Sequence, residues 1–227
     1  MHTNDYTIHK AKVISVKRIS QHTYHLRVQS DDFAAMDYIP GYTINFFIGD
    51  PAIPGTPDRK YSIWNYEPVQ NIADLAISTF SNGPGAQWIQ SLQKDSVIYY
   101  KTPKGKLLLD DSADYYFMIG DVTSLSHLYE INRNLPVSKQ VYSFIYSNDK
   151  DDVYADIDGS YPLDYHIFNS GDIVHIKNEL LTSLPDVTGN GLAYVLGSPQ
   201  ACMEIQAFLR NEKGWKPSKL KTKAFWK

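Results

Sequence analysis

Apolar and polar residues alternate along most of the first half of the chain, in short runs separated by turn residues. A period of two is typical of β-strands with one buried face. Pro40-Gly41, Pro54-Gly55 and Pro103-Lys104-Gly105 interrupt the runs, as expected of turns. The pattern predicts a small six-stranded antiparallel barrel, with strands at residues 12–20, 23–28, 43–48, 60–64, 74–79 and 97–101.

One helical pattern follows Gly85 in this half. Trp88, Ile89 and Leu92 recur at a spacing that places them on one face of a short helix. The first amides of such a helix would point at an anion held by the preceding glycines. A helix that closes the barrel and holds no ligand is the alternative.

The second half of the chain alternates strands with helices. Residues 110–114 are polar and indicate a linker. Strands are expected at 115–119, 140–146, 192–196 and 221–226, helices follow the first and third of these, and an irregular acidic stretch runs to about residue 172. This alternation predicts a parallel-sheet α/β fold, so we expect two domains, at residues 1–111 and 112–227.

Composition narrows the class of protein. A formal charge of −3 gives no electrostatic footprint for nucleic acid, and 17 tyrosines suit stacked, half-wet sites. The single cysteine, Cys202, excludes an intramolecular disulfide and a cysteine-ligated iron–sulfur cluster. The seven histidines are scattered, and His22 and His25 fall on opposite faces of a predicted strand, so we expect no resident metal. With neither a signal-peptide core nor a run of transmembrane length, the chain is expected to be cytoplasmic, without membrane insertion.

The tetrad Arg59-Lys60-Tyr61-Ser62, followed by Gly83-Pro84-Gly85, has the composition of a flavin site. Arg59 suits a diphosphate, Tyr61 can stack on an isoalloxazine ring and Ser62 can hydrogen-bond its edge. The glycines let backbone amides approach phosphate oxygens. Alternatively, the tetrad is an ordinary half-buried strand.

Two further turns lie where a parallel sheet binds ligands, outside the carboxyl ends of its strands. Gly120-Asp121-Val122-Thr123 follows the first predicted strand of the second domain, and Gly197-Ser198-Pro199 follows the third. Gly120 permits close approach, Thr123 and the helix start can hold a pyrophosphate, and Gly197 leaves room for a nicotinamide ring. A GxGxxG fingerprint is absent, and turns of this kind favour small residues even without a ligand.

The order of these motifs resembles the ferredoxin-reductase-like flavoproteins, and most closely the siderophore-interacting proteins, which are FAD-dependent reductases of iron chelates. The resemblance implies that FAD is held by Arg59, Tyr61 and Ser62, with its diphosphate at Gly83 to Ala86, and that the nicotinamide side is formed by Gly120, Asp121 and Thr123. The full set of expected cofactor-binding residues adds Lys60, Trp88, Gly197, Ser198 and Trp226.

This chain departs from the family pattern at three places. Trp64 stands where a second arginine is usual, Val122 replaces a glutamate, and Gly197-Ser198 replaces Gly-Glu. The last departure leans toward the wider ferredoxin-reductase group, whose turn reads Cys-Gly-Ser-Pro, with Leu196 in the cysteine's place. These departures bear on the substrate more than on the flavin.

The carboxyl-terminal segment ends on Phe225-Trp226 and is rich in lysine. The aromatic pair resembles the one that ends the last strand in this family and covers the flavin; packing into the core is the alternative. Lys219, Lys221 and Lys223 are expected to attract an anionic ferric chelate, although such a run is also typical of a solvated face.

The resemblance implies electron transfer from NADH or NADPH through FAD to a ferric siderophore or other ferric chelate, with the chemistry borne by the cofactor rather than by a catalytic side chain. The acidic segment 147–152 favours NADH, unless Ser147 and Lys150 form a small phosphate site. Two alternatives remain. One is a ferredoxin- or flavodoxin-type or flavin reductase, with a ferredoxin-like protein as a further potential electron donor; the other is a flavin- or chelate-binding module without turnover.

Overall fold

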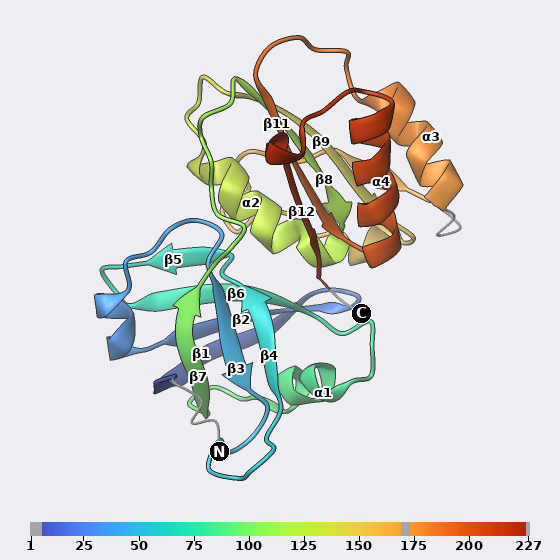
Figure 1. Cartoon of the computed structure of the whole chain (residues 1–227). Coiled ribbons are helices and arrows are strands. Elements are labelled where there is room, and N and C mark those ends of the chain that lie inside the picture. The colour runs from blue at the N-terminus through green and yellow to red at the C-terminus, as the bar shows by residue number, and fades with distance from the viewer. Residues whose placement is uncertain (1–5, 169–172, 226–227) are drawn as a thin grey trace. The chain divides into compact units, whose positions relative to one another are not determined.

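The computed structural model describes residues 6–168 and 173–225. The chain divides into two compact units, Met1–Leu108 and Leu109–Lys227, which we call the barrel unit and the α/β unit and describe separately (Figure 1).

The barrel unit holds a seven-stranded antiparallel sheet, one strand more than the sequence predicts. The strands are β1 (Ile8–Ser20), β2 (Thr23–Gln29), β3 (Thr43–Phe47), β4 (Asp58–Ser62), β5 (Asn65–Glu67), β6 (Ile72–Ser78) and β7 (Val97–Lys104), in the spatial order β4-β3-β7-β1-β2-β6-β5. The additional strand, β5, has three residues and pairs with β6 through Asn65 and Asp74. So short a segment carries no visible alternation, which explains why the pattern missed it.

The sheet closes through the two residues between its terminal strands, β4 and β5. The Ile63 N–H donates to the Tyr42 carbonyl at 3.0 Å, and the next N–H, that of Trp64, donates to the Asp74 carbonyl at 2.7 Å. One residue therefore bonds toward β3 and the next toward β6, as alternation along an extended chain requires. Figure 1 shows the strands of this unit, in blue to green, curving around a common core.

The inward faces of these strands and the helix α1 (Pro84–Ser91) form the barrel core. Leu26, Ile44, Phe46 and Leu75 are fully buried, as is Ile89 of α1. A short 3-10 helix, η1 (Asp31–Ala35), adds the buried ring of Phe33. The predicted helical face is therefore confirmed, and it anchors the start of α1 against the barrel.

The α/β unit is built on a five-stranded parallel sheet. Its strands are β8 (Tyr115–Asp121), β9 (Gln140–Ser147), β10 (Tyr165–Ile167), β11 (Gly191–Gly197) and β12 (Leu220–Ala224), in the order β10-β9-β8-β11-β12. The helices are α2 (Leu125–Asn134), α3 (Ile173–Ser183) and α4 (Pro199–Asn211), with 3-10 turns η2 (Val122–Ser124), η3 (Lys150–Asp152) and η4 (Pro217–Lys219).

Side-chain alternation along β8 assigns its two faces. Phe117 and Ile119 pack with Ile205 of α4 and Leu180 of α3 in one core, whereas Gly120 faces α2. Figure 1 shows α2 on one side of the sheet and α3 and α4 on the other. Parallel strands covered on both faces are buried throughout, and every residue of β8 and β11 is buried.

The sequence did not predict β10 or α3. The strand β10 lies in the stretch read as irregular and has only three residues. The helix α3 begins at Ile173, just after the stretch read as irregular, and its buried residues are Ile176 and Leu180. A stripe of two residues is too narrow to distinguish a helix from a polar loop.

Candidate functional site

The barrel unit brings Arg59, Tyr61 and the start of α1 together. Arg59 and Tyr61 are two residues apart on β4, so their side chains share one face of the strand. Tyr61 lies opposite Ile44 of β3, and its ring stacks on Trp88 of α1 with 6.2 Å between centroids and 7° between planes. The strand and the helix thus hold one aromatic pair between them.

Gly85 is the point of closest approach in this cluster. A β-carbon at Gly85 would lie 2.5 Å from the Tyr61 hydroxyl oxygen and 3.5 Å from Cγ of Arg59. The first distance is too short for any side chain, so glycine is what allows Tyr61 to reach the helix start. The predicted association of the tetrad with the glycine turn therefore has a direct geometric basis.

The start of α1 suits an anion. Gly83 is the N-cap, and the N–H groups of Ala86 and Gln87 donate back to its carbonyl at 3.0 and 3.1 Å. Pro84 has no N–H, and the Gly85 N–H in the first turn has no acceptor within the helix. This amide and the Arg59 guanidinium provide complementary groups for a diphosphate, so the residues present fit FAD.

Tyr61 stays protonated across the physiological range. Burial raises the pKa of its hydroxyl to about 12, against the opposing effect of the positive charge of Arg59. The phenol is therefore neutral, and its hydroxyl remains a hydrogen-bond donor.

The structure does not bring the Lys60 side chain to this cluster. Alternation places Lys60 and Ser62 on the opposite face of β4, where Lys60 lies across from Asn45. Since the Ile63 N–H points toward β3, the N–H groups of Lys60 and Ser62 point toward the other edge of β4. Any contact between Lys60 and a cofactor on the Tyr61 face would therefore involve its main chain.

The α/β unit places Asp121, Tyr146 and Gly197 side by side at the carboxyl ends of three strands. Asp121 pairs in register with Tyr146 of β9, and Gly120 pairs with Leu196 of β11. Asp121 accepts hydrogen bonds from the N–H of Thr123 at 2.9 Å and from its hydroxyl, and so caps η2. The predicted turn of residues 120–123 exists, but its polar side chains bond to each other.

The two glycines at this edge make room for atoms of the unit itself. A β-carbon at Gly120 would lie 2.2 Å from Oγ of Ser124 and 2.8 Å from the Leu196 carbonyl oxygen. A β-carbon at Gly197, whose φ is +117°, would lie 2.5 Å from the Asp121 carboxylate. These internal contacts already account for glycine at both positions, without a bound nucleotide. Nucleotide contacts by Gly120, Asp121, Thr123 and Gly197 stay predictions.

Ser198 begins α4 as its N-cap. Its hydroxyl accepts from the Ala201 N–H at 3.5 Å, and its carbonyl accepts from the Cys202 N–H at 2.9 Å. Burial raises the pKa of the Cys202 thiol to about 12, so this cysteine remains an unreactive thiol.

The acidic segment after β9 has a defined fold. The Ser147 hydroxyl donates to the Asp149 carbonyl at 2.7 Å and accepts from the Asp149 N–H at 3.2 Å. Asp149 caps η3 through the Asp151 N–H at 2.9 Å, and Asp152 is buried. With its hydroxyl engaged in this turn, Ser147 is poorly placed for the alternative phosphate site.

Phe225 packs within its own unit. Its N–H donates to the Gly197 carbonyl at 3.0 Å, and its ring meets that of His127 on α2 edge-on, with 5.7 Å between centroids. Phe225 is half-buried in this position, and a role of the aromatic pair in covering the flavin stays a prediction, since Trp226 lies outside the described residues.

Of the three lysines expected to bind substrate, two have partners in the α/β unit. Lys221 pairs with Asp110 at 3.2 Å, and the Lys223 ammonium lies 5.2 Å from the centre of the Phe225 ring. Within the described part of the chain, no ion pair involves Lys219. Substrate binding by these lysines stays a prediction.

Within residues 6–168 and 173–225, no group of three or more histidine, cysteine, aspartate or glutamate side chains could hold a metal ion. His25 instead meets the fully buried Asp74 at 2.7 Å, beside Arg27, and the His22 ring stacks on Phe80. No helix among the same residues is long and apolar enough to span a membrane.

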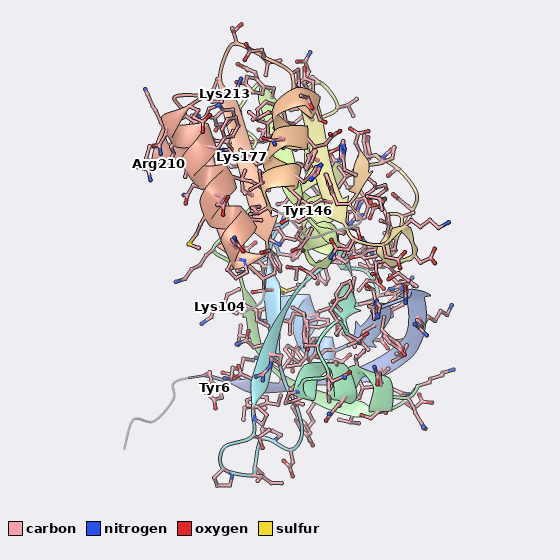
Figure 2. All side chains as sticks on the ribbon, turned by 90° about the vertical axis from the view of Figure 1, so that its right-hand side faces the viewer. Tyr6, Lys104, Tyr146, Lys177, Arg210 and Lys213 are labelled. Atoms are coloured by element: carbon pink, nitrogen blue, oxygen red, sulfur yellow. The ribbon has the colours of Figure 1, made fainter. Side chains whose placement is uncertain are left out.

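Sequence reasoning did not single out Tyr146. Its only signal was its place at the end of a strand, since its proximity to Asp121 depends on how β8 and β9 align. Figure 2 labels this side chain within the α/β unit.

Two family profiles cover nearly the whole chain. Residues 10–108 match the oxidoreductase FAD-binding domain, and residues 113–227, just over half of the chain, match the siderophore-interacting protein family. The comparison with curated proteins found no match.

Solved structures share the fold at low sequence identity. The siderophore-interacting protein from Acinetobacter baumannii aligns with a TM-score of 0.81 and 14% identity, over 97% of this chain and 90% of that one. The siderophore-interacting protein from Aeromonas hydrophila aligns with a TM-score of 0.80 and 17% identity, over 97% and 98%. A ferredoxin-NADP+ reductase from Plasmodium falciparum, solved with 2'P-AMP, aligns with a TM-score of 0.74 and 16% identity, over 98% and 99%.

Proposed function

Because the chain belongs to the siderophore-interacting protein family and carries its FAD-binding oxidoreductase domain, we propose that it takes electrons from NAD(P)H and reduces a ferric siderophore or other ferric chelate. The observation that carries this proposal is the cluster of Arg59, Tyr61 and Gly85, in which a β-carbon on the glycine would collide with the tyrosine.

The protein's own part in the reaction is binding and orientation. Arg59 and the Gly85 amide hold the diphosphate of FAD, and the neutral Tyr61 ring, backed by Trp88, supports the isoalloxazine. The bound flavin supplies the redox chemistry, since it can exchange two electrons with a nicotinamide and single electrons with iron. Reduction of Fe(III) to Fe(II) weakens coordination by hard oxygen ligands, so iron leaves the chelate.

NADH is the preferred donor in this proposal. The adenosine end of a nucleotide at the β9 edge would meet the segment 147–152, which has three carboxylates and one lysine. Net negative charge there disfavours a 2′-phosphate, which requires Arg or Lys. The engagement of the Ser147 hydroxyl with Asp149 supports the same preference.

The visible spectrum of the purified protein tests the proposal. We expect a yellow protein that bleaches with NADH in the absence of oxygen and regains its colour when a ferric siderophore is added. Bleaching that no ferric chelate reverses would indicate a ferredoxin- or flavin-type reductase instead. A colourless protein that cannot be reconstituted with FAD would indicate a module without turnover.

The donor preference is tested separately. With one ferric acceptor, kcat/KM for NADH should exceed that for NADPH, and a clear NADPH advantage would show that the preference is wrong. The identity of the chelate, a protein electron donor and a cytoplasmic location stay predictions.

A further inference from the structure

Asn82 and Gly83 form one of the two Asn-Gly pairs in the chain, and they immediately precede the helix α1. The other pair is Asn190-Gly191. An asparagine before glycine can lose its side-chain amide without an enzyme, because glycine has no β-carbon to hinder attack by its own nitrogen. Whether this happens depends on how firmly the fold holds each pair.

The first pair leaves the reacting groups unengaged. Asn82 is exposed and lies outside any helix or strand. Its carbonyl accepts from Nε2 of Gln87 at 3.1 Å, but neither its side-chain amide nor the Gly83 N–H has a hydrogen-bond partner among the described residues. The attacking nitrogen and the carbon that it attacks are therefore free to approach each other.

The second pair is fixed in place. The Asn190 side-chain amide donates to the Ser112 carbonyl at 2.8 Å, and the Asn190 carbonyl accepts from the Asp114 N–H at 2.8 Å. Gly191 begins β11 and is buried, and a β-carbon there would lie 2.4 Å from the Tyr115 ring. Ring closure would have to break these contacts, so the same dipeptide should be stable here.

We infer that Asn82 is a site of spontaneous deamidation in the flavin-free protein. The Gly83 nitrogen attacks the side-chain carbonyl carbon of Asn82, the new bond closes a succinimide ring, and the amide nitrogen leaves as ammonia with the proton of the Gly83 N–H. Water then opens the ring. Cleavage of the new bond gives aspartate, whereas cleavage of the original peptide bond gives isoaspartate, in which the main chain runs through the side chain.

Either product changes the expected anion site. A carboxylate one residue before the N-cap Gly83 stabilises the helix, because negative charge is favourable near a helix N-terminus. The same carboxylate repels the FAD diphosphate and competes with it for the Gly85 amide and Arg59. Isoaspartate also adds a methylene group to the main chain at this point. Deamidation should therefore weaken flavin binding and leave the fold intact, a consequence that rests on the proposed function because it takes FAD as the ligand.

Bound FAD should in turn protect Asn82. A diphosphate at the start of α1 accepts hydrogen bonds from main-chain amides and orders the residues that must rotate for ring closure. Protein that stays without flavin would then lose its capacity to bind it again, over the time that deamidation takes.

Peptide mass spectrometry tests the modification. Flavin-free protein is incubated warm at mildly alkaline pH, where more of the attacking nitrogen is deprotonated. The peptide with Asn82 should gain the mass difference between an amide and an acid, while the peptide with Asn190 stays unchanged. In urea-denatured protein both should convert at similar rates. With free FAD about tenfold above its Kd, conversion of Asn82 should slow about tenfold. Equal conversion of the two peptides in folded protein, or an intact Asn82, would overturn the inference.

Three variants measure the consequence for flavin binding. Asn82→Asp should raise the Kd for FAD about five- to tenfold at low salt and less at high salt, with Tm unchanged or slightly higher. Asn82→Gln, whose longer side chain closes a ring much more slowly, should retain FAD binding after the same incubation. Gln90→Glu is the control, because it puts the same charge in the last turn of α1 and should leave Kd almost unchanged. An Asn82→Asp variant that binds FAD like the wild type, or whose Tm falls by several degrees, would overturn this consequence.

The two measurements separate this inference from the proposed function. If the wild-type protein binds FAD and Asn82 stays intact in the flavin-free protein, the inference alone fails. If Asn82 converts but the unmodified protein binds no FAD, the proposed function fails, and the consequence for flavin binding fails with it.

Discussion

Glycine serves opposite purposes in the two units of this protein. In the barrel unit, the space at Gly85 is filled by the hydroxyl of Tyr61, a residue of the candidate flavin site. In the α/β unit, the spaces at Gly120 and Gly197 are filled by Ser124, the Leu196 carbonyl and the Asp121 carboxylate. The same residue type thus makes room for a ring that we expect to contact the flavin in one unit and for internal packing in the other.

This difference shows what a glycine in a motif can and cannot indicate. A missing β-carbon reports a close approach, but not which atoms approach. Substitution of a glycine that shapes a ligand site should change binding, whereas substitution of one that permits internal packing should change stability.

The largest effect is expected at the residues that Gly85 accommodates. Arg59→Ala together with Tyr61→Ala removes a charge-assisted contact and an aromatic contact, together about 3–5 kcal/mol of FAD binding. The purified double variant should lose its flavin on dialysis, as followed at the flavin absorbance maximum. Lys60→Ala is the control from the same strand, and it should keep the flavin because its side chain faces away. Full retention of flavin by the double variant would remove the assignment.

Gly197→Ala should destabilise the α/β unit by about 3 kcal/mol, because it combines an unfavourable φ with a clash against a buried carboxylate. The measurement is the free energy of unfolding in urea. Gly214→Ala is the control, since Gly214 has a φ of +70° and nothing within 4 Å of its added β-carbon. It should cost only about 1 kcal/mol, the price of a left-handed conformation. An equal loss of unfolding free energy in both variants would show that the contact with Asp121 does not add to the cost at Gly197.

Gly85→Ala should instead weaken FAD binding and leave the stability of the barrel unit almost unchanged. Its β-carbon displaces only the far end of the Tyr61 side chain, so stability should change by less than about 1 kcal/mol, while FAD affinity falls about tenfold because the ring moves. Adding Tyr61→Phe should restore part of the affinity, because the hydroxyl at 2.5 Å is removed and the ring carbon at 3.8 Å is an ordinary contact. If Tyr61→Phe restores no FAD affinity, the loss caused by Gly85→Ala does not come from the clash with the Tyr61 hydroxyl.

The smallest effect is expected at the lysines near the carboxyl terminus. Charge reversal at Lys219, Lys221 and Lys223 should slow reduction of an anionic ferric siderophore about two- to fivefold at low salt and flatten its salt dependence, with flavin retained. Reversal of Lys213 and Lys216, in the same basic segment, is the control and should change little. Matching rates and salt responses in the two variants would identify the lysines as a solvated face.

Strands and helices were predictable from the sequence where enough residues repeat the apolar pattern for it to be recognised. The alternation along β2, β3 and β6 and the apolar runs of β8 and β11 established both fold types and their order. The short strands β5 and β10 and the helix α3 were missed, because three residues, or a stripe of two, contain less than one clear period.

At the candidate site, local spacing was informative about faces. Alternation alone puts Arg59 and Tyr61 on one side of β4 and Lys60 on the other, so a contact between Lys60 and a flavin on the Tyr61 side would use its main chain. Spacing could not show that Tyr61 touches Gly85, 24 positions later, because that contact depends on how α1 packs on the barrel.

The residue pattern was therefore sufficient to predict the two fold types and to locate the flavin motif and the turns at the strand ends. Each of these features depends on residues that are only a few positions apart in the sequence. The neighbours of Asp121 were not accessible in the same way. Its proximity to Tyr146 and Gly197 follows from the register of three parallel strands whose residues are far apart in sequence. Register depends on how side chains pack across strands and against the covering helices, so it exists only once the sheet has assembled.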